Sequence, residues 1–375
     1  MINLSCEDKR FVEETWQKLK AKLEVTTVKS QNKIPYSTKE GVHNDQADPE
    51  KGFIYLWTNG FWAGLNNLMY AETKNENFLK TAKASEVHLD RIFKNVFRMD
   101  HDVGFLWHLS SSALYRLTGS EESLNRALLA AMTLSARYNP DGNFIRVWDN
   151  GRDGWTIVDC LMNINLLYFA TEKFKDNRFK SIAMRYADMA MRDHVREDGS
   201  IYHIVEHALD KPDTVLSYPQ GQGYSPESCW SRGQGWTVYG FILSYIHTGK
   251  VEYLETAKKT GRYFIEQVKK TGYLPLVDFK APETPVYYDS TAGAIVSCGL
   301  IEIYKATGDK YYLEEALNIL KAMEKVWVNY TLEEDSILQM GSESYRKGIH
   351  MPIIYGDFFF VEAILKLKGS DFLIW

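Results

Sequence analysis

Two aspartates in this chain have neighbours that suit acid–base chemistry. The first, Asp102, follows a histidine in the run His101-Asp102-Val-Gly-Phe. A carboxylate beside an imidazole can move a proton during a reaction, and the glycine allows close approach. The same position also suits a helix N-cap, in which Asp102 accepts the first backbone N–H groups of a helix over 104–117. Capping and catalysis are compatible at a helix start.

The second aspartate, Asp159, lies in the apolar stretch Trp155-Thr-Ile-Val-Asp159-Cys-Leu-Met-Asn163. If this stretch is helical, Asp159 shares a face with Trp155 and Asn163. Because no lysine or arginine lies within a helical turn, a buried carboxyl group here is costly to ionise. A carboxyl group that keeps its proton near neutral pH can act as a general acid. The alternative is a structural carboxylate satisfied by the backbone or by Asn163.

A third run, Trp230-Ser-Arg232-Gly-Gln-Gly-Trp236, places an arginine between tryptophans and glycines. The planar guanidinium of Arg232 can hold a carboxylate with two hydrogen bonds. The glycines leave room for a ligand or for another helix. Arg232 therefore either binds an anionic ligand or pairs with an internal acid at a helix crossing.

Aromatic residues make up 14% of the chain, with 10 Trp and 23 Tyr. Large rings bury much area in a core, and they also stack on flat apolar faces such as those of pyranose sugars. For any one ring the core is the commoner place. Tryptophans beside Asp, Gly and Arg, as in the runs above, favour a sugar-binding cleft at those positions.

His203 and His207 are four residues apart, a spacing that could bind a metal on a helix. Gly199 and the β-branched residues between argue against a helix, and no third ligand stands out. The four cysteines form no CxxC pair and are expected to be free thiols. We predict no metal and no cofactor, and expect His203 to make a polar contact with a sugar.

The formal net charge of −5 over 375 residues argues against nucleic acid or an anionic membrane as the main partner. No stretch approaches the roughly 20 apolar residues that a membrane helix needs. The first residues lack the basic start and apolar run of a signal peptide. We therefore expect a cytoplasmic protein that binds neither nucleic acid nor membrane.

Helical periodicity recurs along the whole chain and predicts about twelve helices. They lie near 8–24, 60–72, 75–96, 104–117, 121–137, 155–172, 176–194, 230–247, 251–269, 289–306, 310–328 and 357–367. Thr-Gly turns at Gly119, Gly249 and Gly308 separate consecutive helices, because glycine takes the left-handed conformation at a helix exit. Six such hairpins closing into a ring predict an all-α (α/α)6 barrel, in one domain over 1–375.

The chain resembles the unsaturated glucuronyl hydrolases of glycoside hydrolase family 88. The matching runs are the three quoted above, together with Trp57-Thr-Asn-Gly-Phe-Trp-Ala-Gly64, Tyr288-Asp-Ser-Thr-Ala-Gly-Ala294 and Ile354-Tyr-Gly-Asp-Phe358. The resemblance implies the same (α/α)6 barrel and no cofactor. It also implies a small-molecule substrate, an oligosaccharide with a 4,5-unsaturated uronic acid that a polysaccharide lyase has left at its non-reducing end. The family hydrates the C4=C5 enol ether, and the resulting hemiketal opens and releases the uronate.

By this resemblance, Asp159 is the catalytic acid/base that donates a proton to C4 and assists water at C5. Asp102 is the second essential carboxylate, close to the sugar ring. The remaining positions are expected to bind the substrate. They are His101, His203, Gln222, Arg232 and Trp236, with Trp57 and Trp148 stacking on the sugar.

The run Ser342-Glu-Ser-Tyr-Arg-Lys347 resembles a loop with which some family members hold sulfated glycosaminoglycan disaccharides. Ser342 and Lys347 are therefore candidates for sulfate binding, with Tyr345 in place of one expected serine; the alternative is a solvated loop. The expected substrate derives from chondroitin, hyaluronan or heparin. Other functions remain open: an unsaturated rhamnogalacturonyl hydrolase acting on pectin fragments, a sugar epimerase, and a non-catalytic carbohydrate-binding α-toroid.

Overall fold

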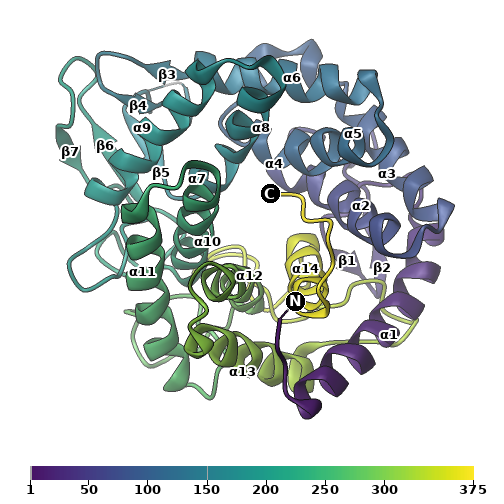
Figure 1. Ribbon diagram of the computed structural model, residues 1–375. Coiled ribbons are helices and arrows are strands. Elements are labelled where there is room, and N and C mark those ends of the chain that lie inside the picture. Colours follow the sequence, from purple (N-terminus) through teal and green to yellow (C-terminus); the bar gives the residue numbers. More distant parts are fainter. Residues whose placement is uncertain (1, 150) are drawn as a thin grey trace.

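The computed structural model describes residues 2–149 and 151–375, whose helices form two concentric rings (Figure 1). Six helical segments form the inner ring: α2 (Phe61–Thr73), α4 (Val103–Trp107) continuing through a π-helix (His108–Ser112) into α5 (Ala113–Thr118), α7 (Cys160–Asn163) with α8 (Asn165–Phe174), α10 (Ser231–Thr248), α12 (Ser290–Thr307) and α14 (Ile354–Lys368). Six helices surround them: α1 (Cys6–Lys29), α3 (Glu76–Leu89), α6 (Glu121–Ala136), α9 (Asn177–Asp193), α11 (Val251–Lys269) and α13 (Lys310–Trp327). The predicted (α/α)6 barrel is confirmed.

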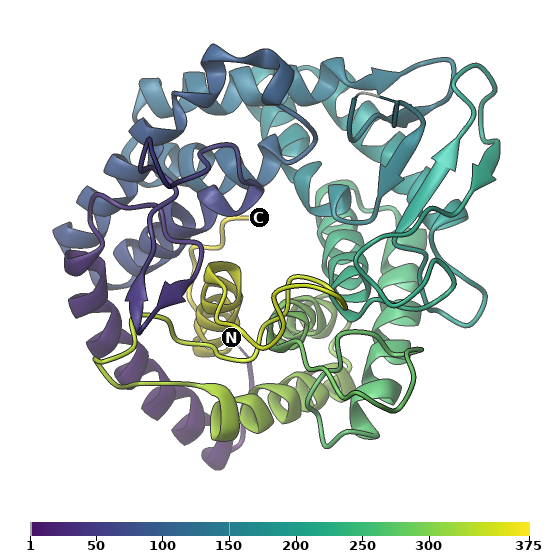
Figure 2. The same ribbon diagram turned by 180° about the vertical axis from the view of Figure 1, so that it is seen from behind.

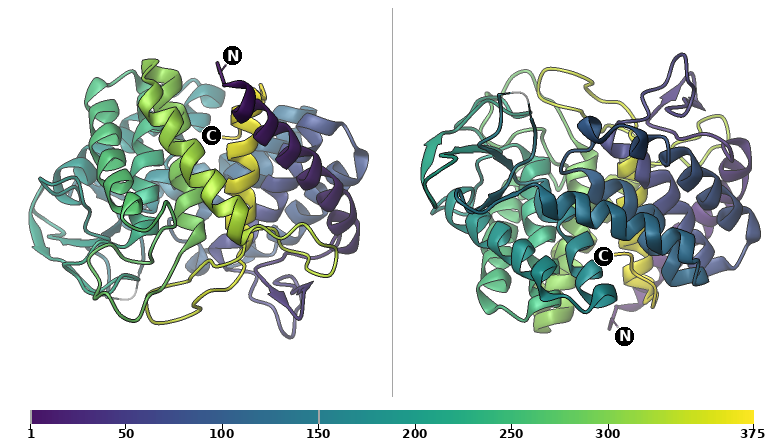
Figure 3. Two further views of the ribbon diagram at one scale, coloured as in Figure 1. Left: turned by 90° about the horizontal axis from the view of Figure 1, so that it is seen from below. Right: turned by 90° about the horizontal axis from the view of Figure 1, so that it is seen from above.

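Each inner segment contacts its inner neighbours and at least one outer helix. Segments α2, α8, α10 and α12 pack against the outer helix that follows them in the chain. The ring closes where α14 contacts both α2 and α1, so the last helix lies beside the first two (Figures 1 and 3). No single hairpin can therefore bury its own apolar surface, and the ring folds as a unit.

The core lies between the two rings. Helices α10, α12 and α14 are buried continuously over 231–244, 290–303 and 354–367. A helix that is buried all round belongs to the interior, whereas α11 and α13 bury one face and expose the other. Within the described residues, no helix has the length and apolar character needed to cross a membrane.

The Thr-Gly turns have the predicted conformation. Gly119, Gly249 and Gly308 have φ angles of 73°, 72° and 73°, in the left-handed region. Helices α6, α11 and α13 each start two residues later. Because side chains with a Cβ resist this conformation, glycine allows each hairpin to turn tightly.

Three predicted helices are wrong in part. The helix over 75–96 ends at Leu89, and the helix over 104–117 contains the π-helical turn. The stretch 155–172 begins as strand β5 (Trp155–Ile157), because its β-branched residues pair with β6 (Ile204–His207). The other short elements are β1 (Thr38–Lys39), β2 (Val42–His43), β3 (Tyr138–Asn139), β4 (Phe144–Ile145), β7 (Val215–Ser217), and the 3-10 turns η1 (Trp57–Gly60), η2 (Ile92–Lys94) and η3 (Val96–Arg98).

The six inner segments all begin at one end of the barrel, which we call the mouth. The β1–β2 hairpin and the loop between α13 and α14 lie at this end, and both chain termini lie at the other (Figures 2 and 3). The positive ends of the inner helix dipoles therefore converge on the mouth, where they favour negative charge.

Candidate active site

A pocket of about 250 Å³ at the mouth brings the two predicted carboxylates together. Asp102 and Asp159 both line it. The other predicted site residues in its wall are Trp57, His101, Trp148 and Gln222, and the wall is completed by Phe53, Tyr55, Leu56, Asp100 and Ile157. These residues come from loops far apart in the sequence, and the barrel unites them because each loop leads into or adjoins an inner helix.

Asp159 lies between strand β5 and helix α7, where the chain leaves the sheet and enters the inner ring. Its side chain is 10% exposed, and its Oδ2 has no hydrogen-bond partner among the described residues. Nε2 of His203 lies 3.3 Å from this oxygen but is not aligned for a hydrogen bond. A buried oxygen without a partner is unusual in folded proteins. Oδ2 is thus available to a substrate or a water molecule.

His203 is held in one tautomer by the loop that precedes α10. Its Nδ1 accepts the backbone N–H of Gln222 at 3.0 Å. The proton of the neutral ring therefore lies on Nε2, which faces Asp159. Gly221 permits this contact, because a Cβ at that position would lie 2.1 Å from Nδ1. The ring of Trp230 packs on the imidazole with the centroids 4.2 Å apart.

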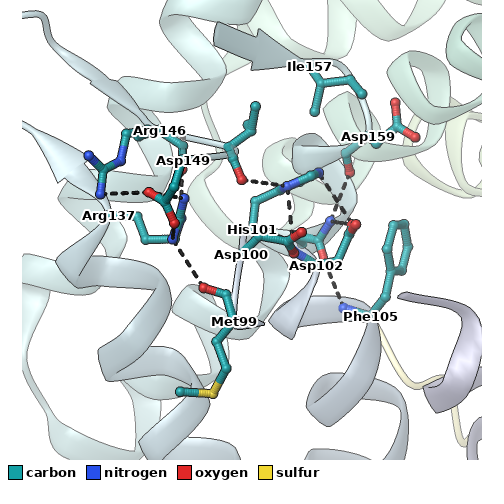
Figure 4. Close-up of polar contacts among 12 residues, drawn as sticks. Met99, Asp100, His101, Asp102, Phe105, Arg137, Arg146, Asp149, Ile157 and Asp159 are labelled. Carbon is teal, nitrogen blue, oxygen red and sulfur yellow. Dashed lines mark hydrogen bonds and ion pairs between the residues drawn. The ribbon is translucent and has the colours of Figure 1, made fainter. Parts of the chain in front are cut away.

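The imidazole of His101 lies beside the carboxyl group of Asp102, and its contacts show which of the two groups holds the proton between them (Figure 4). Nδ1 of His101 lies 3.1 Å from the carbonyl oxygen of Val147 and must donate to it. Its Nε2, 3.3 Å from Oδ1 of Asp102, is then an acceptor in the neutral ring. Burial lowers the pKa of His101. Burial, together with the charges of Asp100 and Asp159, raises the pKa of Asp102 well above its ordinary value, so the proton stays on Asp102.

The N-cap prediction for Asp102 is wrong, because its side chain makes no capping hydrogen bond to α4. Instead, Oδ1 of Asp102 accepts from Nδ2 of Asn163 at 3.1 Å. Oδ1 of Asn163 in turn accepts the backbone N–H of Phe105 at 2.6 Å, and its Nδ2 lies 3.3 Å from the carbonyl oxygen of Asp159. Asn163 thus ties the start of α4 to the start of α7. The predicted helical face shared with Trp155 does not exist, because Trp155 lies on β5.

Arg232, in the first turn of α10, is 1% exposed and bonded within the protein. Nη1 donates to Oδ2 of Asp289 at 2.9 Å and to the carbonyl oxygen of Ser342, and Nη2 donates to the carbonyl oxygen of Glu343 at 2.6 Å. The pairing with an internal acid is therefore present. Arg232 also lines a second pocket, of about 170 Å³, which shares Leu56, Trp57 and Gln222 with the first.

Three predicted site residues line neither pocket: His203, described above, Trp236 and Ser342. Trp236 is fully buried, and it meets Trp57 edge to face with centroids 6.3 Å apart. Ser342 is also fully buried; its hydroxyl donates to the carbonyl oxygen of Tyr288 at 2.7 Å and accepts the N–H of His350 at 3.1 Å. Both side chains hold the walls of the site in place rather than facing its interior.

Lys347 lines the second pocket with its side chain 81% exposed, and its Nζ lies 3.0 Å from Oε2 of Glu343. The loop that carries Lys347 also fixes Gln222. Nε2 of Gln222 donates to the carbonyl oxygen of Glu343 at 2.6 Å, and its carbonyl oxygen accepts the N–H of Tyr345 at 2.8 Å. The order of contacts from this loop to Gln222, His203 and Asp159 was not visible in the sequence.

Asp100, His101 and Asp102 offer potential metal-ligand atoms within 4.8 Å of one another. Val147 and Asp102 already occupy both ring nitrogens of His101, so a cation here would have to displace these contacts. Sequence reasoning missed Phe53 and Tyr55 in the wall of the first pocket. Their alternation in Phe53-Ile-Tyr55-Leu-Trp57 was the available signal for rings on one side of an extended segment.

Comparison with known proteins gives consistent results. The model of Glycosyl Hydrolase Family 88 matches residues 26–277. An unsaturated chondroitin disaccharide hydrolase of Streptococcus pyogenes serotype M1 is 33% identical over 83% of this chain and 80% of its own length. The structure of an unsaturated glucuronyl hydrolase from Bacillus sp. GL1, responsible for the degradation of glycosaminoglycan, superposes with a TM-score of 0.86 at 30% identity, over 94% of this chain and 97% of that one.

A variant of the Streptococcus agalactiae unsaturated glucuronyl hydrolase has been solved with the sulfated disaccharide dGlcA-GalNAc6S. It superposes with a TM-score of 0.79 at 26% identity, over 97% of this chain and 93% of that one.

Proposed function

Because the chain belongs to glycoside hydrolase family 88, we propose that it removes 4,5-unsaturated uronic acid from the non-reducing end of lyase-generated glycosaminoglycan oligosaccharides. The observation that carries this proposal is Oδ2 of Asp159, a buried carboxylate oxygen with no partner among the described residues, in a pocket that Asp102 also lines. The chondroitin and glycosaminoglycan activities of the similar proteins support this class of substrate.

In the proposed reaction, the carboxyl group of Asp159 donates its proton to C4 of the unsaturated uronate, and water adds to C5. The resulting carboxylate takes the proton that this water loses, so Asp159 ends the step as it began. The hemiketal at C5 then opens to a ketone, and the hemiacetal left at C1 releases the next sugar. The acid and base here act on C4 and C5 instead of the anomeric carbon, so carboxylate separation does not predict retention or inversion.

The surroundings of the carboxyl pair support proton delivery from Asp159. Oδ1 of Asp102 is engaged by Asn163 and His101, whereas Asp159 lines the pocket and its Oδ2 has no hydrogen-bond partner among the described residues. The raised pKa of Asp102 keeps a neutral carboxyl group beside the negatively charged uronate. The converging positive ends of the inner helices attract that charge, and Trp57 and Trp148 offer rings for stacking.

We also propose that residues 1–375 act as one catalytic domain, because the pocket walls come from segments as distant as Tyr36 and Tyr355. A cytoplasmic location is supported by the free cysteines, three of them buried, which a reducing compartment preserves. The proposed partner is the oligosaccharide itself.

The test follows the ultraviolet absorbance of the conjugated C=C–carboxylate group in unsaturated chondroitin, hyaluronan and heparin disaccharides. Wild-type protein should remove this absorbance, and Asp159→Asn should not; Asp141→Asn, the same change at an exposed site, serves as the matched control. Turnover of only an unsaturated rhamnogalacturonan disaccharide would move the protein to pectin fragments. Sugar binding without any loss of absorbance would indicate a non-catalytic protein.

Sulfated disaccharides are proposed to be tolerated, with Lys347 as the exposed cation in the wall of the second pocket. The complex of the similar Streptococcus agalactiae protein with dGlcA-GalNAc6S supports this point. Here Lys347 is paired with Glu343, so a sulfate would have to compete with that carboxylate. Comparing sulfated with unsulfated disaccharides in wild type and Lys347→Ala decides the role of Lys347. An unchanged preference would rule it out.

A further inference from the structure

The catalytic pocket opens into a larger pocket that the proposed reaction leaves unused. This outer pocket has a volume of about 420 Å³ and shares four lining residues with the catalytic one, namely Phe53, Tyr55, Asp100 and Trp148. Its remaining wall consists of Phe97, Arg98, Asp149 and Arg152. A sugar chain that starts at Asp159 can therefore continue across Trp148 into a space already formed.

Two arginines stand in the wall of the outer pocket. The guanidinium of Arg98 lies 5.7 Å from the centroid of Tyr55, and that of Arg152 lies 5.6 Å from Trp148 and 5.1 Å from Trp155. Cation–π contacts of this kind hold a guanidinium in place without using its N–H donors. Both arginines are exposed, so these donors can reach a ligand.

The acids of the outer pocket are already bonded to other groups. Asp149 pairs with Arg137 at 3.3 Å and with Arg146 at 2.8 Å, as Figure 4 shows. Oδ1 of Asp100 accepts the backbone N–H of Asp102 at 2.9 Å. Among the described residues, Arg98 and Arg152 have no ion pair with a carboxylate, so their charge is available to an anion.

The second pocket, which Arg232 lines, suits the end of a glycan better than a glycan that continues through it. It is smaller, at about 170 Å³ against 420 Å³, and the buried Arg232 and Tyr355 form part of its wall. The outer pocket is bordered by exposed side chains, including Phe97 at 89% exposure. The geometry therefore directs the rest of the glycan toward the outer pocket.

Resting on the proposed function, we infer that the outer pocket is a binding subsite for the third residue of the substrate, and that Arg98 and Arg152 bind the carboxylate of a uronic acid there. Glycosaminoglycans of the chondroitin and hyaluronan type alternate uronate and hexosamine. With the unsaturated uronate at Asp159, the second residue is a hexosamine beside Trp148, and the third is again a uronate. Arginine forks suit a carboxylate at this position.

The experiment compares kcat/KM for the unsaturated hyaluronan tetrasaccharide and disaccharide. In wild type we expect the tetrasaccharide to be preferred about fivefold, mainly through KM, as two partly exposed charge-assisted contacts allow. The double variant Arg98→Gln/Arg152→Gln should bring the ratio to about one and leave disaccharide turnover unchanged. The double variant Lys83→Gln/Lys211→Gln, which makes the same charge change at exposed sites away from the pocket, should keep the wild-type ratio.

A tetrasaccharide whose internal carboxyl group has been reduced to the alcohol separates charge from stacking, and it should be turned over like the disaccharide. The subsite proposal is overturned if wild type has equal kcat/KM for the two lengths, or if Arg98→Gln/Arg152→Gln still prefers the tetrasaccharide. In either case, turnover of the disaccharide leaves the proposed function intact. If wild type turns over no unsaturated disaccharide, the proposed function fails, and the subsite proposal fails with it.

Discussion

Buried charged side chains occur at both ends of the barrel, and they differ in how fully they are paired within the protein. At the far end, opposite the mouth, Lys366 is 1% exposed and its Nζ lies 2.6 Å from Glu302 and 3.8 Å from Glu362. Glu362 also accepts from Tyr239 Oη at 3.0 Å and from Trp375 Nε1 at 3.3 Å. Every charge in this far-end cluster therefore has a partner within the protein.

At the mouth, by contrast, buried polar atoms of the site have no hydrogen-bond partner among the described residues; they include Oδ2 of Asp159, Nε2 of His203 and Nε of Arg232. Burying polar groups without partners lowers the stability of a protein. The charges of the far-end cluster around Lys366 are satisfied within the protein, whereas Oδ2 of Asp159 is left without a partner, so variants at these two places should affect different properties.

The largest expected effect is on activity, at the mouth. Asp159→Asn should lower kcat about 10³-fold, because it removes the proposed proton donor, while the melting temperature stays the same or rises. Absorbance kinetics and thermal unfolding of the same preparation measure both properties. A variant that loses activity and stability together would make Asp159 a structural residue like those of the far end.

The second effect should appear in stability, at the far end. Lys366→Met leaves Glu362 buried without its cation and Glu302 with only the partly exposed Lys305, which should cost about 3 kcal/mol of unfolding free energy. Turnover per folded molecule should stay within about twofold of wild type. Lys368→Met, which removes a more exposed lysine paired with Glu72, should cost less than about 1 kcal/mol. Denaturant titration compares the two variants.

The pH dependence of stability should also separate the ends. Burial, with the charges of Arg116 and His247, lowers the pKa of His108, which contacts Trp375, to about 3. The unfolded chain takes up this proton near pH 6.5 and the folded chain does not, so stability is lost as pH falls below 6.5. The contribution of His108 to this loss of unfolding free energy should reach about 2 kcal/mol by pH 5, and His108→Gln should remove that contribution.

For Asp102, at the mouth, the sign of the pH effect is opposite, whereas the lowered pKa of its neighbour His101 acts in the same direction as that of His108. The raised pKa of Asp102 means that the folded protein binds this proton more tightly than the unfolded chain. Asp102 therefore adds stability as pH falls through its raised pKa, and Asp102→Asn should abolish that contribution. Unfolding titrations at a series of pH values resolve the two trends. Equal slopes in His108→Gln and wild type would contradict the assignment at the far end.

The smallest expected effect concerns positioning at the mouth. Gly221→Ala places a Cβ against Nδ1 of His203 and should shift the ring from Asp159. We expect kcat to fall about tenfold with little change in KM, together with a changed pH–rate profile. Gly151→Ala, at a glycine with open space around its Cβ, is the control for the same substitution without a clash. A wild-type pH–rate profile in Gly221→Ala would exclude a role for this contact.

Much of the fold was predictable because it depends on local signals. Apolar periodicity marked the paired helices, and the Thr-Gly turns at Gly119, Gly249 and Gly308 marked their junctions. Strand β5 was missed because Trp155, Thr156 and Ile157 become a strand through pairing with β6, which lies almost 50 residues away. Long-range pairing of this kind leaves no periodic signal in a short apolar run.

The site could be predicted where the type of residue alone indicates the chemistry. It could not be predicted where tertiary contacts determine the partner of a side chain. Asp102 and Asp159 were expected together, and they line one pocket. Of the two alternatives left open for Arg232, the pairing with an internal acid is present, with Asp289, because the loops before α12 and α14 meet there. The route from Glu343 through Gln222 to His203 depends on backbone hydrogen bonds, which sequence letters do not encode.

The closure of the ring by α14 against α1 and α2 has a consequence for the synthesis of the protein. The mouth needs Tyr36 and Trp57 from the first part of the chain and Arg232 and Tyr355 from the last. A ribosome-bound chain that lacks α14 therefore has neither a closed ring nor a complete wall around Trp57. Turnover should begin only after the final helix has left the ribosome, so a partly made chain cannot act on sugars.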